Sequence, residues 1–170
     1  MSLDTWDEPN WCPGCGNYSI WNALKMALKD LGLPRDEVVM TGGIGCSSKL
    51  PYWVNVNAFA GLHGRPLALA TGVKLANPDL TVIASGGDGD GFAEGTNHFI
   101  HFCRRNVDVN YFVHNNQIYG LTKGQASPTS EEGFITKTSP WGFTRALNPL
   151  SIALSSGATF VARGYAGDLK

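Results

Sequence analysis

The residues Gly87-Asp88-Gly89-Asp90 follow an apolar run at 80–84, and Asn115-Asn116 follow the next such run, at 109–113. Asp88 and Asn116 are 28 residues apart, which leaves room for a helical crossover between two parallel strands. Because parallel strands end at the same edge of a sheet, a carboxylate and an amide oxygen are expected together there. Mg²⁺ prefers such oxygen ligands, completed by phosphate and water, and glycines let backbone N–H groups approach a diphosphate at a helix N-terminus. The two motifs predict a site for a Mg²⁺-bound diphosphate cofactor.

Helical and strand patterns alternate along the rest of the chain. The first helix, for example, has apolar residues at helical spacing and stops at Gly32, shortly before Pro34. Strands alternating with helices predict an α/β fold, a parallel sheet with helices on both faces. No repeat or linker divides the chain, so residues 1–170 are expected to form a single domain. Helices are predicted at 17–31, 65–76, 91–105 and 150–155, and strands at 37–41, 55–59, 80–84, 108–114 and 159–162.

The composition narrows the function classes. The 170 residues are 43% hydrophobic and 16% charged, with a formal net charge of −1. No basic cluster is longer than Arg104-Arg105, which argues against binding to nucleic acid or to a membrane surface. The N-terminus does not resemble a signal peptide, no apolar run approaches a membrane span, and four cysteines are too few for a secreted disulfide scaffold. We therefore expect a cytoplasmic protein.

The segment 116–148 has no clear periodicity and is rich in Gly, Ser, Thr and Pro. Loops of this length within a domain usually have a function or contact a partner. This one also contains Phe134, Trp141 and Phe143, large aromatic side chains that a protein normally buries. Residues 134–143 are therefore predicted to pack against a partner subunit, and residues 121–125 to lie over the diphosphate and the substrate.

Three cysteines form a candidate metal site. Cys12 and Cys15 are spaced as a C-x₂-C pair, and Cys46 follows in a glycine-rich stretch. Two thiolates at this spacing can bind one metal ion or one cluster edge. An iron–sulfur cluster is the favoured interpretation, and the alternatives are a Zn²⁺ site completed by His63 or free thiols in a tight turn. The fourth cysteine, Cys103, is predicted to be a buried core residue on a helix.

Six stretches of the chain occur in the order and at the spacings of one known family. Together they resemble the beta subunit of 2-oxoacid:ferredoxin oxidoreductases, over about residues 10–165. The stretches are WCPGCG at 11–16, GCS at 45–47, HGR at 63–65, ATG at 70–72, GDGD at 87–90 and NNQIYGLTKGQ at 115–125. The resemblance implies a thiamine diphosphate-binding fold, Mg²⁺, a [4Fe-4S] cluster, coenzyme A as acyl acceptor and ferredoxin as electron acceptor.

The resemblance also implies roles for individual residues. Asp88 and Asn116 would give side-chain oxygens to Mg²⁺, and Ile118 its backbone carbonyl. Three of the four cluster ligands would be Cys12, Cys15 and Cys46. Candidate cations near the substrate carboxylate are Lys49, His63, Arg65 and Lys123. The expected cofactor-binding residues are Cys46, Ser47, Gly87, Asp88, Gly89, Asp90, Asn116, Ile118, Gly120 and Leu121.

Several of these residues also fit other roles. His63 could be a structural histidine in a glycine-flanked turn, and Lys49 a surface lysine. Asp90 fits either a hydrogen-bond partner of the site or a helix N-cap. Leu121-x-Lys123 resembles family members that accept 2-oxoglutarate as well as pyruvate, since a lysine there can pair with a distal carboxylate.

Beta subunits of this family are longer than this chain, and the resemblance implies that the fourth cluster cysteine lies beyond residue 170. The domain is therefore expected to be C-terminally incomplete, and the cluster to be unstable in it. In the family a glutamate of the alpha subunit activates the cofactor, so the chain alone is expected to be inactive.

The expected function is oxidative decarboxylation of 2-oxoglutarate or pyruvate to acyl-CoA, with the electrons passed to ferredoxin. The alternatives are a truncated non-catalytic module and half of a non-oxidative thiamine diphosphate decarboxylase or synthase. The three cysteines argue against the last alternative, because such enzymes need no cluster.

Overall fold

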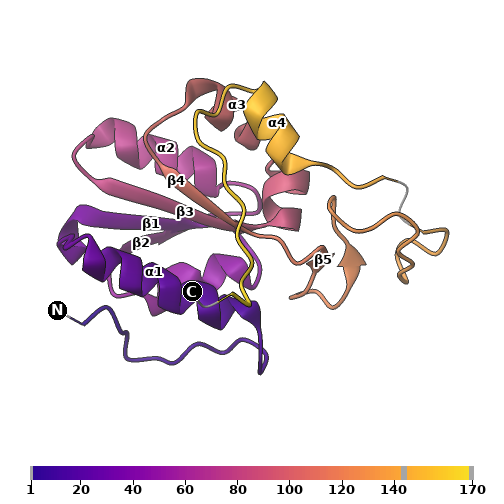
Figure 1. Ribbon diagram of the computed structural model, residues 1–170, viewed down its shortest axis with the longest axis horizontal. Helices are drawn as coiled ribbons and strands as arrows, with labels where there is room; N and C mark the ends of the chain where they lie inside the picture. Colours follow the sequence, from indigo (N-terminus) through magenta and orange to yellow (C-terminus); the bar gives the residue numbers. More distant parts are fainter. Residues whose placement is uncertain (1, 143–144, 169–170) are drawn as a thin grey trace.

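A parallel sheet of four strands forms the middle of the fold. The computed structural model describes residues 2–142 and 145–168 (Figure 1). The strands are β1 (Val38–Gly42), β2 (Asn57–Ala60), β3 (Thr81–Gly87) and β4 (Asn110–His114). Their order is β2-β1-β3-β4 with parallel neighbours throughout. Every residue of central β1 is buried, whereas every residue of edge strand β2 is exposed, because only the central strands are covered on both faces.

Helices cover both faces of this sheet, as the alternating pattern predicted (Figure 1). They are α1 (Gly16–Asp30), α2 (Pro66–Ala76), α3 (Thr96–Arg105) and α4 (Pro149–Ser155), with helical turns η1 (Arg35–Glu37), η2 (Ser47–Trp53) and η3 (Asp90–Glu94). Residues of α1 and η2 share one buried cluster with Met40 and Ile83. Residues of α2, α3 and α4 share a second cluster with Val82 and Ala84. Successive residues of β3 thus point into opposite cores.

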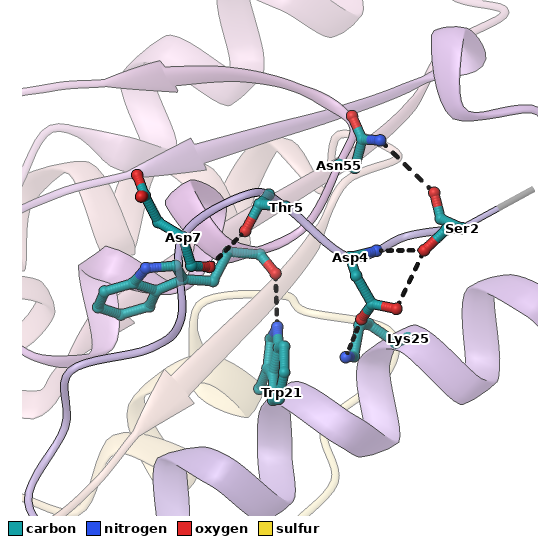
Figure 2. Close-up of polar contacts among 8 residues, drawn as sticks. Ser2, Asp4, Thr5, Asp7, Trp21, Lys25 and Asn55 are labelled. Atoms are coloured by element: carbon teal, nitrogen blue, oxygen red, sulfur yellow. Dashed lines mark hydrogen bonds and ion pairs between the residues drawn. The ribbon is translucent and has the colours of Figure 1, made fainter.

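The N-terminal segment is bound along α1. Figure 2 shows the Ser2 hydroxyl donating to Asp4, and Lys25 of α1 pairing with Asp4 at 2.6 Å. On the same side Trp21 Nε1 donates to the backbone carbonyl of Trp53 at 2.6 Å and joins α1 to η2. These contacts fix the segment that leads into the C-x₂-C pair.

The structure differs from the sequence predictions in three places. The predicted strand at 159–162 is wrong, because the Thr159 N–H donates to the Asn106 side chain at 3.2 Å instead of to a neighbouring strand. The predicted helix at 91–105 is divided into the π-helical turn η3 and α3. The aperiodic segment contains two short antiparallel strands, β5 (Ile118–Tyr119) and β6 (Gln125–Ala126).

Beyond α4 the chain returns across the molecule to α1 (Figure 1), where Ala166 lies 3.0 Å from the position of a Cβ on Gly16. None of the helices in the described ranges is long and apolar enough to cross a membrane. Phe143, one of the aromatic residues predicted to contact a partner, lies outside the described residues.

Candidate functional site

The crossovers of the sheet diverge between β1 and β3. After β1 the chain crosses to β2 on one side, and after β3 it crosses to β4 on the other. In open α/β sheets ligands bind in the crevice at such a switch point, beyond the carboxyl ends of the strands. Gly43 follows β1 and Asp88 follows β3, so the motif that the sequence singled out lies at this position.

Asp88 is almost fully buried, with 1% of its surface exposed. Its Oδ2 accepts hydrogen bonds from the hydroxyls of Ser127 and Thr129, the second at 2.7 Å. A buried carboxylate is costly unless polar groups compensate for lost water, and the two hydroxyls do so here. Among the described residues no hydrogen bond reaches Oδ1, so this oxygen is left for a further partner.

The pairing of β3 with β4 brings the two predicted motifs together. Gly87 pairs with His114, so the residues that follow them, Asp88 and Asn115, leave the sheet side by side. Thr129 joins the two, since its hydroxyl oxygen lies 2.7 Å from Asp88 Oδ2 and 2.8 Å from Asn115 Oδ1. The prediction that both motifs share one edge of the sheet is confirmed.

Asn116 begins the turn into β5. Its side chain is exposed, and its Oδ1 accepts a hydrogen bond from the Ile118 N–H at 3.2 Å. Gln117, between them, has φ 61°, a left-handed conformation that few residues other than glycine adopt. The Gln117 carbonyl accepts the Ser130 hydroxyl at 2.5 Å. The segment after β6 therefore supports the turn that positions Asn116 and Ile118.

Asp90 connects two loops to the motif. Its Oδ1 accepts the N–H of Ile44, after β1, at 2.9 Å and the N–H of Gly64, before α2, at 2.8 Å. Burial raises the pKa of Asp90, while these two N–H groups oppose the shift. Within the described residues, its Oδ2 and the Tyr111 hydroxyl are buried without a hydrogen-bond partner. The N-cap alternative for Asp90 is wrong. Gly89 occupies the N-cap of η3, and no side chain caps the N-terminus of that turn by a hydrogen bond.

Close approaches explain two glycines of the motif. A Cβ on Gly87 would lie 3.1 Å from the Ser47 hydroxyl oxygen, so η2 reaches the end of β3. A Cβ on Gly89 would lie 2.5 Å from the ring of Tyr119, which leaves no room for a side chain. Tyr119 in turn donates to Glu94 at 3.2 Å. These glycines admit η2 and β5 to the site.

Cys12, Cys15 and Cys46 gather at the N-terminus of α1. The Cys15 N–H donates to the Cys12 carbonyl at 3.0 Å, and Trp11 Nε1 donates to the Cys46 carbonyl at 2.7 Å. Burial raises the pKa of the Cys46 thiol; the charge of Lys49 opposes this, and the other two thiols add to it. All three are free thiols.

In the described ranges no three His, Cys, Asp or Glu side chains are placed to hold one metal ion. The Zn²⁺ alternative with His63 therefore has no support in the structure. A [4Fe-4S] cluster distributes four thiolates over several irons, so it does not require them around a single ion. Cys103 is 4% exposed in the core beside α4, as predicted.

The four candidate cations do not form one group. Lys49 Nζ donates to Asn10 Oδ1 at 3.2 Å and borders an open cleft of about 470 Å³ beside the N-terminal segment. His63 and Arg65 are exposed on either side of Gly64, next to Asp90. Lys123 is exposed in the turn between β5 and β6, together with Gly120 and Leu121.

Sequence reasoning missed three buried hydroxyl residues at the site, Ser127, Thr129 and Ser130, which are exposed by 0%, 3% and 1%. Their only signal was a run of Ser, Pro and Thr in an aperiodic loop, and such a run is usually solvated. Also missed was the contact between His114 and Asn17, whose Oδ1 lies 2.7 Å from His114 Nδ1.

Comparisons with known proteins identify the family of the domain. Residues 43–170 match the sequence profile of the thiamine pyrophosphate enzyme C-terminal TPP binding domain. The 2-oxoacid:ferredoxin oxidoreductase subunit beta of Saccharolobus solfataricus is 52% identical over 97% of this chain and 54% of that protein. The 2-oxoglutarate oxidoreductase subunit KorB of Mycobacterium tuberculosis is 50% identical over 95% of this chain and 43% of that protein.

A solved structure is also similar. It is the 2-oxoglutarate:ferredoxin oxidoreductase from Magnetococcus marinus with 2-oxoglutarate, coenzyme A and succinyl-CoA bound, which matches with a TM-score of 0.96 at 44% identity. The match covers 98% of this chain and 58% of that one, and the chain spans about half the length of the curated relatives it matches. The family profile includes both strand-end motifs and most of the sequence, so the chain belongs to the thiamine pyrophosphate enzymes, as a C-terminal TPP-binding domain.

Proposed function

We propose that this chain is the thiamine diphosphate- and Mg²⁺-binding beta subunit of a 2-oxoacid:ferredoxin oxidoreductase. Such an enzyme decarboxylates a 2-oxoacid oxidatively, forms an acyl-CoA and passes electrons to ferredoxin. The main support is the buried Asp88 carboxylate at the switch point of the sheet, with one oxygen bonded to hydroxyls and the other without a donor among the described residues. The names of the similar proteins support the same reaction class.

The donor set fits Mg²⁺ with a diphosphate. Asp88 would give a carboxylate oxygen, Asn116 an amide oxygen and Ile118 its backbone carbonyl, with phosphate oxygens and water completing the shell. Gly87 and Ser47 meet next to Asp88 and would approach the diphosphate through backbone N–H groups. Thiamine diphosphate, when bound, supplies the electron sink for decarboxylation.

The three gathered thiols suit a [4Fe-4S] cluster. Cys12, Cys15 and Cys46 would provide three of its four thiolates, and the cluster supplies one-electron transfer when bound. The hydrogen bond from Trp11 to the Cys46 carbonyl fixes the backbone of one ligand. Free thiols of this kind persist in a reducing compartment such as the cytoplasm.

The substrate that we propose is 2-oxoglutarate, with pyruvate as the smaller alternative. The similar Magnetococcus marinus structure has 2-oxoglutarate, coenzyme A and succinyl-CoA bound. In this chain Lys123 follows Leu121 on an exposed turn beside the site and would pair with the distal carboxylate. Lys49, His63 and Arg65 would attract the carboxylate next to the ketone.

We infer that an alpha subunit is the partner of this chain, since the similar proteins are named as beta subunits. The exposed aromatic part of the 116–148 segment is the surface that we assign to it. Phe134 and Trp141 are 37% and 94% exposed.

The test is an Asp88→Asn substitution in the enzyme assembled with its alpha subunit. The amide keeps an oxygen for the Ser127 and Thr129 hydroxyls but removes the charge that attracts the dication. We expect the Mg²⁺-dependent affinity for thiamine diphosphate to fall about 100-fold or more, measured by calorimetric titration.

The matched control is Asp79→Asn, an exposed aspartate between α2 and β3 that no part of the site contacts. It should bind both cofactors as the unmodified enzyme does. Thermal unfolding of both variants checks that the domain is folded. An unchanged affinity in Asp88→Asn would rule out the metal site and, with it, the proposed function.

A further inference from the structure

We propose that Ser127 and Thr129 are positioning residues for Asp88. They bind one carboxylate oxygen, Oδ2, and so direct the other, Oδ1, to the metal ion. The inference rests on the proposed function, because it assumes that Asp88 binds Mg²⁺. It adds two residues from a loop outside the two strand-end motifs to the machinery that binds the cofactor.

The first support is the asymmetry of the carboxylate. Both hydroxyls donate to Oδ2, and no described donor reaches Oδ1. The three side chains are 1%, 0% and 3% exposed for Asp88, Ser127 and Thr129, so water does not compete for these bonds. Hydrogen bonds to a charged, buried acceptor are the strong ones, and two of them on one oxygen fix the rotation of the carboxylate plane.

The second support is the branching at Thr129. Its hydroxyl has one proton but two acceptors, Asp88 Oδ2 and Asn115 Oδ1. Asn115 Oδ1 already accepts the Gln117 N–H at 3.2 Å, which identifies it as the oxygen of the amide. The proton goes to the charged carboxylate, the stronger acceptor. Thr129 is therefore bonded to Asp88, while Asn115 Oδ1, 2.8 Å from the same hydroxyl oxygen, keeps the Gln117 N–H as its donor.

The third support is the rigidity of the turn itself. The Ser130 hydroxyl accepts the Ser127 N–H at 2.9 Å and donates to the Gln117 carbonyl at 2.5 Å. The Ser130 N–H donates to the Ser127 carbonyl at 3.1 Å, and the Pro128 carbonyl accepts the Leu147 N–H at 2.8 Å. The turn at 127–130 is thus closed on itself and bound at both sides, so it can hold a carboxylate without moving.

The experiment compares Thr129→Val with Thr129→Ser in the complete enzyme with its alpha subunit. Valine has the shape of threonine without the hydroxyl, and serine retains the hydroxyl. Mn²⁺ replaces Mg²⁺ as a paramagnetic probe, and the free Mn²⁺ signal is measured during titration in the presence of thiamine diphosphate. We expect Thr129→Val to weaken metal binding about 10- to 100-fold and Thr129→Ser to restore it. At saturating Mg²⁺ kcat should change little, while the KM for Mg²⁺ rises.

Two further variants separate positioning from folding of the loop. Thr159→Val removes an exposed hydroxyl beyond α4, which donates to Asn106 Oδ1 at 3.2 Å, and should have no effect on metal binding. Ser130→Ala removes the bonds to the Gln117 carbonyl and the Ser127 N–H but none to Asp88, and should weaken metal binding less than Thr129→Val. Equal losses in Ser130→Ala and Thr129→Val would overturn the inference.

The failure of this inference differs from the failure of the proposed function. If Asp88→Asn loses metal binding and Thr129→Val retains it, only the positioning role is wrong. If both variants bind metal normally, the metal site itself is wrong.

Discussion

At the residue scale, the buried His114 links the stability of the fold to pH. It ends β4, is 8% exposed, and its Nδ1 lies 2.7 Å from the Asn17 side-chain oxygen of α1. Its Nε2 is buried, with no hydrogen-bond partner in the described part of the chain. Burial lowers the pKa of His114 to about 4, so the ring is neutral at pH 7 with its proton on Nδ1.

This lowered pKa predicts a loss of stability in mild acid. The unfolded chain takes up a proton at His114 near pH 6.5, whereas the folded chain does so only near pH 4. Lowering the pH between these values therefore favours the unfolded state. Between pH 7 and pH 5 we expect His114 to reduce the free energy of unfolding by about 2 kcal/mol, measured by urea denaturation. His114→Gln should remove that part of the pH dependence, and His101→Gln, at an exposed position, should retain it.

The sequence alone singles out Asp88 as a candidate site residue, because an acidic residue between two glycines, directly after an apolar strand, rarely has a purely structural role. It does not identify Thr129, because a threonine in a polar loop has the same local pattern whether it is solvated or bonded to a buried carboxylate. Only the tertiary contact distinguishes the two cases.

At the scale of elements, the loop before α2 packs against the start of α3. Gly64 has φ 68°, and a Cβ on it would lie 2.3 Å from the backbone nitrogen of Gly95. Gly72, within α2, has open space around its Cβ position. The two glycines therefore respond in opposite ways to the same substitution.

We expect Gly64→Ala to reduce the free energy of unfolding by about 2 to 4 kcal/mol, because it combines backbone strain with a backbone clash. Gly72→Ala should increase it by about 0.5 to 1 kcal/mol, because alanine favours the helical state. Urea denaturation of both variants measures the difference. A neutral Gly64→Ala would show that the two loops separate easily.

The helix of strong periodicity and the four strands of the main sheet were predicted well, whereas the chain's last predicted strand and the short hairpin were not. The helix at 65–76 differs from α2 by one residue, since a proline begins it and apolar spacing continues through it. The strand predicted at 159–162 has suitable residues, but a strand needs a neighbour, and Asn106 takes the N–H of Thr159 instead. The hairpin of β5 and β6 has two residues in each strand, too short for a pattern to appear.

At the scale of the whole molecule, the exposed aromatic part of the loop predicts association. Trp141 is 94% exposed and Ile135 69% exposed, which is costly for a surface that stays in water. We expect chymotrypsin to cleave the isolated chain after Trp141, and the alpha subunit to protect that bond at least about 10-fold.

Trp6, which is fully exposed in the N-terminal segment, serves as the internal reference for this digestion. Its cleavage should proceed at the same rate with and without the alpha subunit. Equal cleavage after Trp141 in both samples would mean that the loop does not face the partner.

The order of the strands determines when the protein becomes competent to bind its cofactor during folding. The two central strands, β1 and β3, are neighbours in the sheet but not in the chain, since β2 and α2 come between them. A long loop must close before this pair is formed, and topologies with high relative contact order fold slowly. Asp88 lies at this junction. The site is therefore formed only after β1 has paired with β3, the two paired strands that are furthest apart in the sequence. Cofactor added to a refolding chain would therefore stabilise the product and leave the rate of the main barrier unchanged.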